Sequence, residues 1–400
     1  MTGCRILYHH RIRADDGQAV HVRELIGALR EEGHDVLECA LVQKAGVAAS
    51  PGADAHARRN GSLWNRLRLP RGAIELLEIA YGPQGARRLR LAAADFRPDF
   101  VYERHALHCD AGLRAARSLG VPLLLEVNSP LVDEMQALGA LRFPRRARRT
   151  EHAVLAGADI VFAVTGVLRD LCVGLGARAA RTVVVPNGAV PERYDDAARA
   201  AGRALRSRLS IAADDFVLGF VGFMRPWHRL DLAVEMLLRP ELRALHLVLV
   251  GEGPARADVA AAAVRAGVSS RVHAIGAVDA GELPGCVCAF DAALIPAINR
   301  YASPLKLFDS LAAGVPTICP RQANLEELVI DDRNAVLFAP GDADALRAAT
   351  ARLVLDRAAA RRIGAQGRAD LLTNDWTWRG NARRVIAAYR RLVADMAVPR

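Results

Sequence analysis

The stretch Tyr301-Ala-Ser-Pro-Leu-Lys-Leu-Phe-Asp-Ser-Leu-Ala-Ala-Gly-Val-Pro-Thr317 predicts a short helix with a marked start and end. Ser303 is a favourable N-cap residue, and Pro304 suits the first helical position because an N–H there would have no helical partner. Gly314 is typical of a helix C-terminus, and Pro316 prevents the helix from resuming. Apolar residues at helical spacing predict one buried face: Leu305, Leu307, Phe308, Leu311 and Ala312.

Apolar runs on either side of this helix predict buried strands over Ala289–Pro296 and Val315–Cys319. Strand, loop, helix and strand form a βαβ unit, whose helix starts at the carboxyl edge of the sheet. Free N–H groups and the helix dipole favour an anion there, and Lys306 adds a positive charge. Lys306 is one of only two lysines in the chain, with Lys44. We interpret this helix start as a phosphate-binding site; the alternative is an ordinary crossover helix.

The same alternation of strand and helix runs through the whole chain and predicts an α/β protein. Helices are expected between the strands, for example over Ala19–Glu32, Ala73–Leu91 and Asp342–Leu355. The segment after the predicted turn at Pro186-Asn187-Gly188, up to about Arg199, is expected to be a hinge or linker. Two runs of parallel strands predict two doubly wound, Rossmann-like domains that face each other across a cleft. The remaining predicted strands are Arg5–Tyr8, Asp35–Val42, Phe100–Glu103, Val121–Val127, Asp159–Val164, Thr182–Val185, Phe216–Val221, Leu245–Val250, Val272–Ile275 and Ala335–Phe338.

Composition and motifs exclude several other classes of protein. No apolar run reaches the roughly 18 residues of a membrane span. The N-terminus lacks the features of a signal peptide, and seven scattered cysteines without a C-x-x-C pair favour a cytoplasmic protein with reduced thiols. Nucleic acid is not an expected partner, because aromatic residues are only 5% and no zinc-finger or RNP-type motif occurs. A dinucleotide-binding G-x-G-x-x-G starts at Gly251 but fails at Arg256.

The net charge of +10 is concentrated in short basic segments. Arg58–Arg71 holds five arginines and no acidic residue, and Arg142–Arg149 holds five arginines in eight residues. Each is either a solvated face or a surface that attracts an anionic membrane or a pyrophosphate. Leucines and Trp64 are interspersed with the arginines of the first segment, which fits a segment lying on a membrane surface.

Several motifs in one order resemble the GT-B glycosyltransferases of family 4, the group 1 glycosyltransferases. Tyr301–Pro316 is similar to the "YxSPLKLFEYMAxGxP" form of the family's donor-binding segment. The resemblance extends to Gly17 and the following Gln-Ala-Val-His-Val-Arg-Glu-Leu, to Val185-Pro-Asn-Gly-Ala, and to Val248-Leu-Val-Gly-Glu-Gly-Pro. It therefore covers nearly the whole chain.

The resemblance implies a retaining, metal-independent hexosyltransferase with no cofactor besides its nucleoside diphosphate sugar donor. The acceptor, a glycan or a lipid-linked glycan precursor of cell-surface polysaccharide, is expected on residues 1–190. The donor is expected on residues 191–375, and residues 376–400 form a helix packing back toward the first domain. The enzyme is expected in the cytoplasm, at most peripheral at the inner face of the plasma membrane. The residues implied in donor binding are Gly222, Arg225, His228, Gly251, Gly276, Val278, Ser303, Pro304, Leu305, Lys306 and Asp309; Gly17, His21 and Asn128 are implied on the acceptor side, and Asn128, Arg225 and Lys306 in catalysis.

The chain departs from the family pattern at three places. The family's two acidic residues, eight apart, fall on Tyr301 and Asp309, so only Asp309 is left as the expected ligand of the nucleotide ribose. Phe223 and His228 stand where the family commonly has an arginine and a lysine, and Arg225 is the expected substitute. Asn128 replaces a histidine and can hydrogen-bond a sugar hydroxyl. The alternative function is a catalytically silent sugar-nucleotide-binding or scaffold protein.

Overall fold

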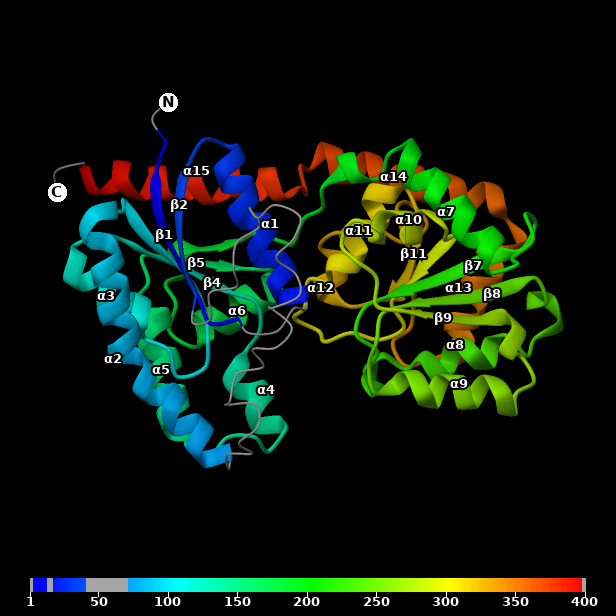
Figure 1. Ribbon diagram of the computed structural model, residues 1–400, viewed down its shortest axis with the longest axis horizontal. Coiled ribbons are helices and arrows are strands. Elements are labelled where there is room, and N and C mark those ends of the chain that lie inside the picture. Colours follow the sequence, from blue (N-terminus) through cyan, green and yellow to red (C-terminus); the bar gives the residue numbers. More distant parts are fainter. Residues whose placement is uncertain (1–2, 13–16, 41–70, 398–400) are drawn as a thin grey trace, which may run out of the picture. The chain divides into compact units, whose positions relative to one another are not determined.

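The computed structural model describes residues 3–12, 17–40 and 71–397 (Figure 1). The chain divides into two compact units. Unit 1 comprises residues 1–164, 168–185 and 383–400, and unit 2 comprises residues 165–167 and 186–382. The chain passes from unit 1 to unit 2 after Val185, whereas the sequence predicts this boundary at residue 190. The last helix is divided between the two units.

Unit 1 contains a six-stranded parallel sheet in the order β2-β1-β3-β4-β5-β6. All six predicted strands are present. Strand β1 extends beyond its predicted end at Tyr8 and continues through His10, and both histidines are buried. The strands are β1 (Arg5–His10), β2 (Asp35–Ala40), β3 (Phe100–Arg104), β4 (Leu123–Val127), β5 (Ile160–Ala163) and β6 (Thr182–Val184).

Helices alternate with the strands of unit 1, as the sequence predicts (Figure 1). The second helix is longer than predicted and continues through Pro83. Gly82 and Gly85 beside this proline let the start of the next helix come close: a Cβ on Gly85 would lie 2.9 Å from the Ala111 Cβ. The helices are α1 (Gly17–Glu31), α2 (Arg71–Phe96), α3 (Ala111–Leu119), α4 (Leu131–Ala137), α5 (Pro144–Gly157), α6 (Gly166–Gly174) and, from residue 383 onward, α15 (Trp378–Ala397).

Unit 2 contains a second six-stranded parallel sheet, in the order β12-β11-β10-β7-β8-β9. Its six strands confirm the predicted α/β, doubly wound fold. Strand β10 is shorter than predicted, because it spans only three residues. The strands are β7 (Phe216–Val221), β8 (Leu245–Val250), β9 (Val272–Gly276), β10 (Ala292–Leu294), β11 (Thr317–Pro320) and β12 (Val336–Phe338).

The helices of unit 2 cover both faces of its sheet with apolar side chains. The predicted linker is wrong in part, because a helix begins at Asp196 and Asp195 caps it by accepting a hydrogen bond from the Ala198 N–H. The helices are α7 (Asp196–Arg208), α8 (Leu230–Met236), α9 (Ala255–Arg265), α10 (Leu283–Cys288), α11 (Leu305–Ala313), α12 (Ala323–Glu326), α13 (Ala343–Leu355) and α14 (Arg357–Thr373).

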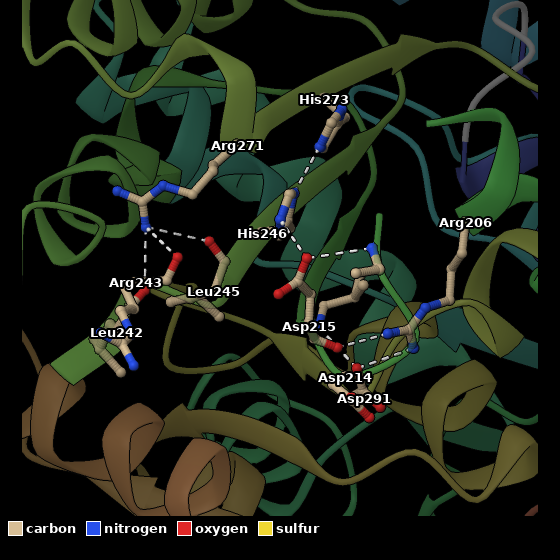
Figure 2. Close-up of polar contacts among 12 residues, drawn as sticks. Arg206, Asp214, Asp215, Leu242, Arg243, Leu245, His246, Arg271, His273 and Asp291 are labelled. Atoms are coloured by element: carbon tan, nitrogen blue, oxygen red, sulfur yellow. Dashed lines mark hydrogen bonds and ion pairs between the residues drawn. The ribbon is translucent and has the colours of Figure 1, made fainter. Parts of the chain in front are cut away.

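Polar side chains tie together the amino ends of the strands in unit 2 (Figure 2). Asp291, just before β10, accepts hydrogen bonds from the Val217 N–H (2.8 Å) and from Arg206 (3.0 Å). The imidazoles of His246 and His273 lie 3.0 Å apart, nitrogen to nitrogen, and His246 also contacts Asp215. These contacts fix the edge of the sheet opposite to the one at which ligands of such folds bind.

Candidate active site

The strand order of unit 2 defines where a ligand is expected. In the sheet, β8 and β9 follow β7 on one side, whereas β10, β11 and β12 follow one another on the other side, so the strand order reverses between β7 and β10. The crevice of an open α/β sheet lies at such a switch point, at the carboxyl ends of the two strands. Here the segments that follow β7 and β10 carry Gly222 and Ser303–Lys306.

Helix α11 starts one residue later than predicted, and Ser303 does not cap it. Pro304 is the N-cap residue, with extended backbone angles, and Leu305 is the first helical residue. The Ser303 side chain instead accepts a hydrogen bond from the Asn187 N–H (3.1 Å), and its carbonyl accepts one from the Asn187 amide (2.5 Å). The predicted C-terminus is confirmed: Gly314 is left-handed (φ +73°), and its N–H bonds back to the carbonyls of Leu311 and Ser310.

The Lys306 amine lies against the chain at the end of β7. Its Nζ is 3.8 Å from the centroid of the Phe220 ring and would be 3.2 Å from a Cβ on Gly222. Gly222 has φ +134°, which side chains rarely adopt, so glycine permits both the turn and the close approach. Although part of the residue remains accessible, burial of the amine lowers its pKa to about 7. Among the described residues, no carboxylate forms an ion pair with it.

A neutral histidine lies beside this lysine. Burial, and then the charges of Lys306 and Arg225, lower the pKa of His228 to about 4. The His228 Nδ1 accepts a hydrogen bond from the Arg225 N–H (3.2 Å), so the ring proton is on Nε2. The Arg225 guanidinium is exposed and lies between the Phe223 and Trp227 rings, 4.8 and 4.9 Å from their centroids. The loop after β7 therefore presents one cation and one neutral donor.

Three predicted glycines come together at this edge. Gly251 donates from its N–H to the Gly276 carbonyl (2.6 Å), and a Cβ on Gly251 would lie 2.2 Å from the Gly222 carbonyl oxygen. All three have positive φ angles. Val278, two residues beyond Gly276, packs on the apolar face shared with α11. Side chains on these glycines would fill the space over the strand ends.

The two positions of the family's acidic pair have different environments. Asp309, on α11, accepts a hydrogen bond from the Tyr194 hydroxyl (2.7 Å). The Tyr301 hydroxyl accepts one from the Asn299 amide (3.0 Å). Buried Asn324 donates to the carbonyls of Asn299 and Ala302, and so fixes the loop before α11. Sequence reasoning missed this role of Asn324, because no local pattern links it to that loop.

In unit 1, predicted residues meet around a buried carboxylate. Glu126, at the end of β4, is 2.9 Å from the His21 Nε2 and accepts hydrogen bonds from Tyr102 (2.8 Å), Arg104 (2.5 Å) and the Asn128 amide (2.5 Å). Burial alone raises the Glu126 pKa, but His21 and Arg104 hold it well below its usual range. His21 and Asn128 thus come together, while Gly17 is an exposed residue at the start of α1.

A second buried cluster lies where β1 and β3 adjoin, at the switch point of this sheet. His9 contacts Glu103 through Nδ1 (2.6 Å) and Tyr81 through Nε2 (2.9 Å). The Cys109 thiol also lies nearby, and the side chains of His9, Glu103 and Cys109 are close enough together to offer ligand atoms to a metal ion. However, both His9 nitrogens already have hydrogen-bond partners, Glu103 and Tyr81. The contacts fit a closed hydrogen-bond network better than a metal site.

Comparison with known proteins matches both units. Residues 215–356 match the family described as glycosyl transferases group 1, and residues 16–188 match the glycosyl transferase 4-like domain. D-inositol 3-phosphate glycosyltransferase of Kineococcus radiotolerans is 30% identical over 76% of this chain and 73% of its own length. 2-Deoxystreptamine glucosyltransferase of Streptomyces kanamyceticus is 28% identical over 62% and 64%. HepE of Anabaena, solved in complex with UDP and glucose, has a TM-score of 0.68 and 16% identity over 97% of this chain and 99% of its own.

These matches define the fold as that of the GT-B glycosyltransferases, as the resemblance implied. The chain belongs to the group 1 glycosyltransferases.

Proposed function

We propose that the protein transfers a hexose, with retention of configuration, from a nucleoside diphosphate sugar to a glycan or lipid-linked acceptor. The observation that carries the donor assignment is the Lys306 amine at the switch point of unit 2, buried against Phe220 and without a carboxylate partner in the described chain. A nearby anion strongly stabilises the protonated form of an amine in that environment. A diphosphate is the anion that such a donor brings. HepE, solved with UDP, has the same fold and supports this choice.

Catalysis, in this proposal, rests on stabilising charge on the departing diphosphate. The Lys306 ammonium, the first N–H groups of α11 and the His228 Nε2–H are donors fixed before the reaction begins. Arg225 supplies a further charge from the exposed end of its loop. This donor set needs no metal ion, and we propose a metal-independent reaction.

We assign the acceptor to unit 1, at the carboxyl ends of β1, β3 and β4. Asn128 and His21 lie there beside ionised Glu126, an arrangement suited to hydrogen-bonding sugar hydroxyls. The relatives named for D-inositol 3-phosphate and 2-deoxystreptamine act on hydroxyl-rich acceptors, which supports this assignment. A cytoplasmic role in cell-surface polysaccharide assembly is part of the proposal.

The proposal is tested by nucleotide release. A thermal-shift screen with UDP-, GDP-, ADP-, dTDP- and CDP-sugars selects the donor, and release of the nucleoside diphosphate is then measured with a crude acceptor extract. Acceptor-dependent release, with or without added chelator, supports a metal-independent transferase. Binding without release by any donor would instead support the silent sugar-nucleotide-binding protein, which the absence of an acid at Tyr301 suggests.

We expect Asp309→Asn to weaken binding of the donor nucleoside by about tenfold, as loss of a hydrogen bond to a charged group does. The carboxylate would accept from the ribose hydroxyls while it is oriented by Tyr194. Calorimetry with the free nucleoside and with the diphosphate should show the same proportional loss for both.

Tyr194→Phe is the matched control for that experiment, because it removes only the hydrogen bond that orients Asp309. Its effect should be smaller than that of Asp309→Asn. An Asp309→Asn protein that binds the nucleoside as tightly as the unchanged protein would show that Asp309 does not bind the ribose.

We also propose that unit 1 docks on an anionic membrane, through a surface that includes the second basic segment. Buried Glu75 accepts from the N–H groups of Arg142 (2.6 Å) and Phe143 (2.9 Å), which fastens the start of α2 to the loop before α5. Exposed apolar side chains gather on these segments: Ile74, Leu76, Leu77, Leu138 and Phe143. Exposed Arg142, Arg145, Arg146 and Arg149 accompany them, whereas Arg148 pairs with Asp133 and Glu151. The first basic segment, up to residue 70, lies outside the described residues, and no described helix is long and apolar enough to cross a membrane.

Replacing Arg145, Arg146 and Arg149 by alanine should weaken binding to vesicles rich in phosphatidylglycerol by about a hundredfold, because each basic residue at such a surface is worth about 1 kcal/mol. Flotation at low and high salt measures this binding. The control removes three exposed arginines from α7, namely Arg199, Arg203 and Arg208, and should leave flotation nearly unchanged. Equal effects of the two triple variants would mean that net charge alone matters.

A further inference from the structure

The loop after β7 displays two aromatic side chains that the proposed function does not use. Phe223 is 51% exposed and Trp227 is 49% exposed, although large aromatic residues are buried for the most part. The Arg225 guanidinium lies between the two rings, 4.8 Å from the Phe223 centroid and 4.9 Å from the Trp227 centroid. The guanidinium covers one face of each ring, and the exposed half of each side chain remains accessible to a ligand.

A buried anchor holds the loop that carries these rings. Met224, between Phe223 and Arg225, is fully buried. Its N–H donates to the Glu252 carbonyl (2.7 Å), and its own carbonyl accepts from the Ala255 N–H (3.0 Å). The next residues form a single 3₁₀ turn that begins at a proline. The two rings are therefore held in place before any ligand arrives, so that little conformational entropy is lost when one binds.

Ring contacts connect Trp227 to the proposed phosphate ligand. The Trp227 ring centroid lies 5.8 Å from that of His228, which in turn lies 5.1 Å from that of Phe220. The Lys306 Nζ is 3.8 Å from the same Phe220 centroid. The exposed aromatic pair and the lysine therefore belong to one continuous surface at the carboxyl edge of the unit 2 sheet.

The two ends of this surface lie on opposite faces of the sheet. Trp227 is in the loop that leads into α8, which packs on one face, whereas Asp309, the expected ligand of the ribose, is on α11, which packs on the other. Lys306 begins on α11, and its amine lies against Phe220, which belongs to the α8 face. A diphosphate bound at Lys306 with its ribose at Asp309 therefore directs its second substituent, the sugar, toward Trp227.

We infer that Phe223 and Trp227 bind the hexose of the donor by stacking against its ring, an inference that rests on the proposed function. The C–H groups on one face of a pyranose ring form an apolar surface with positively polarised hydrogens, which packs on the negative face of an aromatic ring. The Arg225 guanidinium between the rings carries N–H groups that can donate to sugar hydroxyls. The pair thus recognises a pyranose with one face of C–H groups, and it helps to determine which donor is accepted.

The test compares each sugar nucleotide with its own nucleoside diphosphate, by calorimetry on the full-length protein. The pairs are UDP-glucose with UDP, GDP-mannose with GDP, ADP-glucose with ADP, dTDP-glucose with dTDP and CDP-glucose with CDP, and the pair that binds is used throughout. Trp227→Ala should weaken binding of the sugar nucleotide about tenfold and change that of the nucleoside diphosphate by less than about twofold. Trp227→Phe, which keeps an aromatic face, should retain most of the affinity. Saturation-transfer NMR should show transfer from aromatic protons to the hexose protons, and Trp227→Ala should reduce it.

A control variant and the nucleoside diphosphate arm decide how the result is interpreted. Leu238→Ala removes a similarly exposed apolar side chain, at the opposite end of α8, and should leave both affinities unchanged. Equal losses for the two ligands in Trp227→Ala would mean that Trp227 supports the phosphates or the base, and no loss would mean that it contacts neither. Either result, or an equal effect of Leu238→Ala, would overturn the inference and leave the proposed donor site in place. Failure of every pair to bind the unchanged protein would instead contradict the proposed function, and the inference with it.

Discussion

Lys306→Ala is expected to weaken binding of the nucleoside diphosphate by about ten- to a hundredfold while leaving binding of the nucleoside almost unchanged. The amine lies against Phe220 and Gly222, enclosed enough that burial lowers its pKa to about 7. An anion placed beside it would restore the charged form, and no described carboxylate provides that charge in the free protein. Calorimetry with diphosphate and nucleoside, measured in parallel, separates the phosphate contribution from the rest.

The same pKa sets the direction of the pH dependence. Below pH 7 the amine of the free protein is mostly protonated and ready for the diphosphate. Above pH 7 it is mostly neutral, so binding must be accompanied by proton uptake, and the affinity should fall by up to about tenfold per pH unit. Titrations at pH 8 in buffers of different ionisation enthalpy should show this uptake, and Lys306→Ala should abolish it.

Lys306→Arg is the informative control, because it keeps the charge but changes its shape. A planar guanidinium should not fit the space that Gly222 leaves, so partial rather than full recovery of diphosphate affinity is expected. Equal losses for nucleoside and diphosphate in the alanine variant, or no loss at all, would show that Lys306 does not bind phosphate.

The alternation of strands and helices was predictable because each buried parallel strand is a short apolar run with turn residues at its ends. What failed was the local interpretation of polar residues. Ser303 is a residue type typical of an N-cap, yet its hydroxyl and carbonyl oxygens accept hydrogen bonds from Asn187, which is distant in the sequence. His9 and His10 suggest a loop, yet they continue β1 because Glu103 and Glu38 on the adjoining strands satisfy them. Partners on other strands cannot be found by local pattern.

The site could be predicted in part for the same reason. The start of α11 and its lysine follow from one continuous segment, and the glycines follow from strand ends that repeat along the chain. The lowered pKa of Lys306 does not, because it requires Phe220 and Gly222 from a strand far away in the sequence. Likewise, Asn128 was predicted as a single sugar-binding residue, whereas the structure makes it one of four side chains that enclose Glu126.

Glu126→Gln is expected to be the most destabilising conservative substitution proposed for unit 1. The carboxylate is 3% exposed and balances the buried Arg104 guanidinium, with His21 also in contact. Removing one partner of a buried ion pair costs about 3–5 kcal/mol, because the remaining charge is left without compensation. For a unit of this size, that corresponds to a fall in melting temperature of about 6–20 °C. Calorimetry or amide hydrogen exchange in β3 and β4 measures it.

The pH dependence of this loss has a defined sign. The Glu126 pKa is lowered in the folded protein from an ordinary value of 4.5, so its contribution to stability is complete above that value and disappears as the pH falls below it. The unchanged protein should therefore lose stability steeply below about pH 4.5. The Glu126→Gln variant has no titrating carboxyl at position 126, so it should lose less stability over the same pH range. Glu38→Gln is the matched control, because Glu38 pairs with His10 but its side chain is 42% exposed. A surface pair of that kind is worth less than about 1 kcal/mol. If the two variants melted at the same temperature, the cluster around Glu126 would not be what holds the carboxyl edge of unit 1 in place, and Asn128 would owe its position to the backbone of β4 alone.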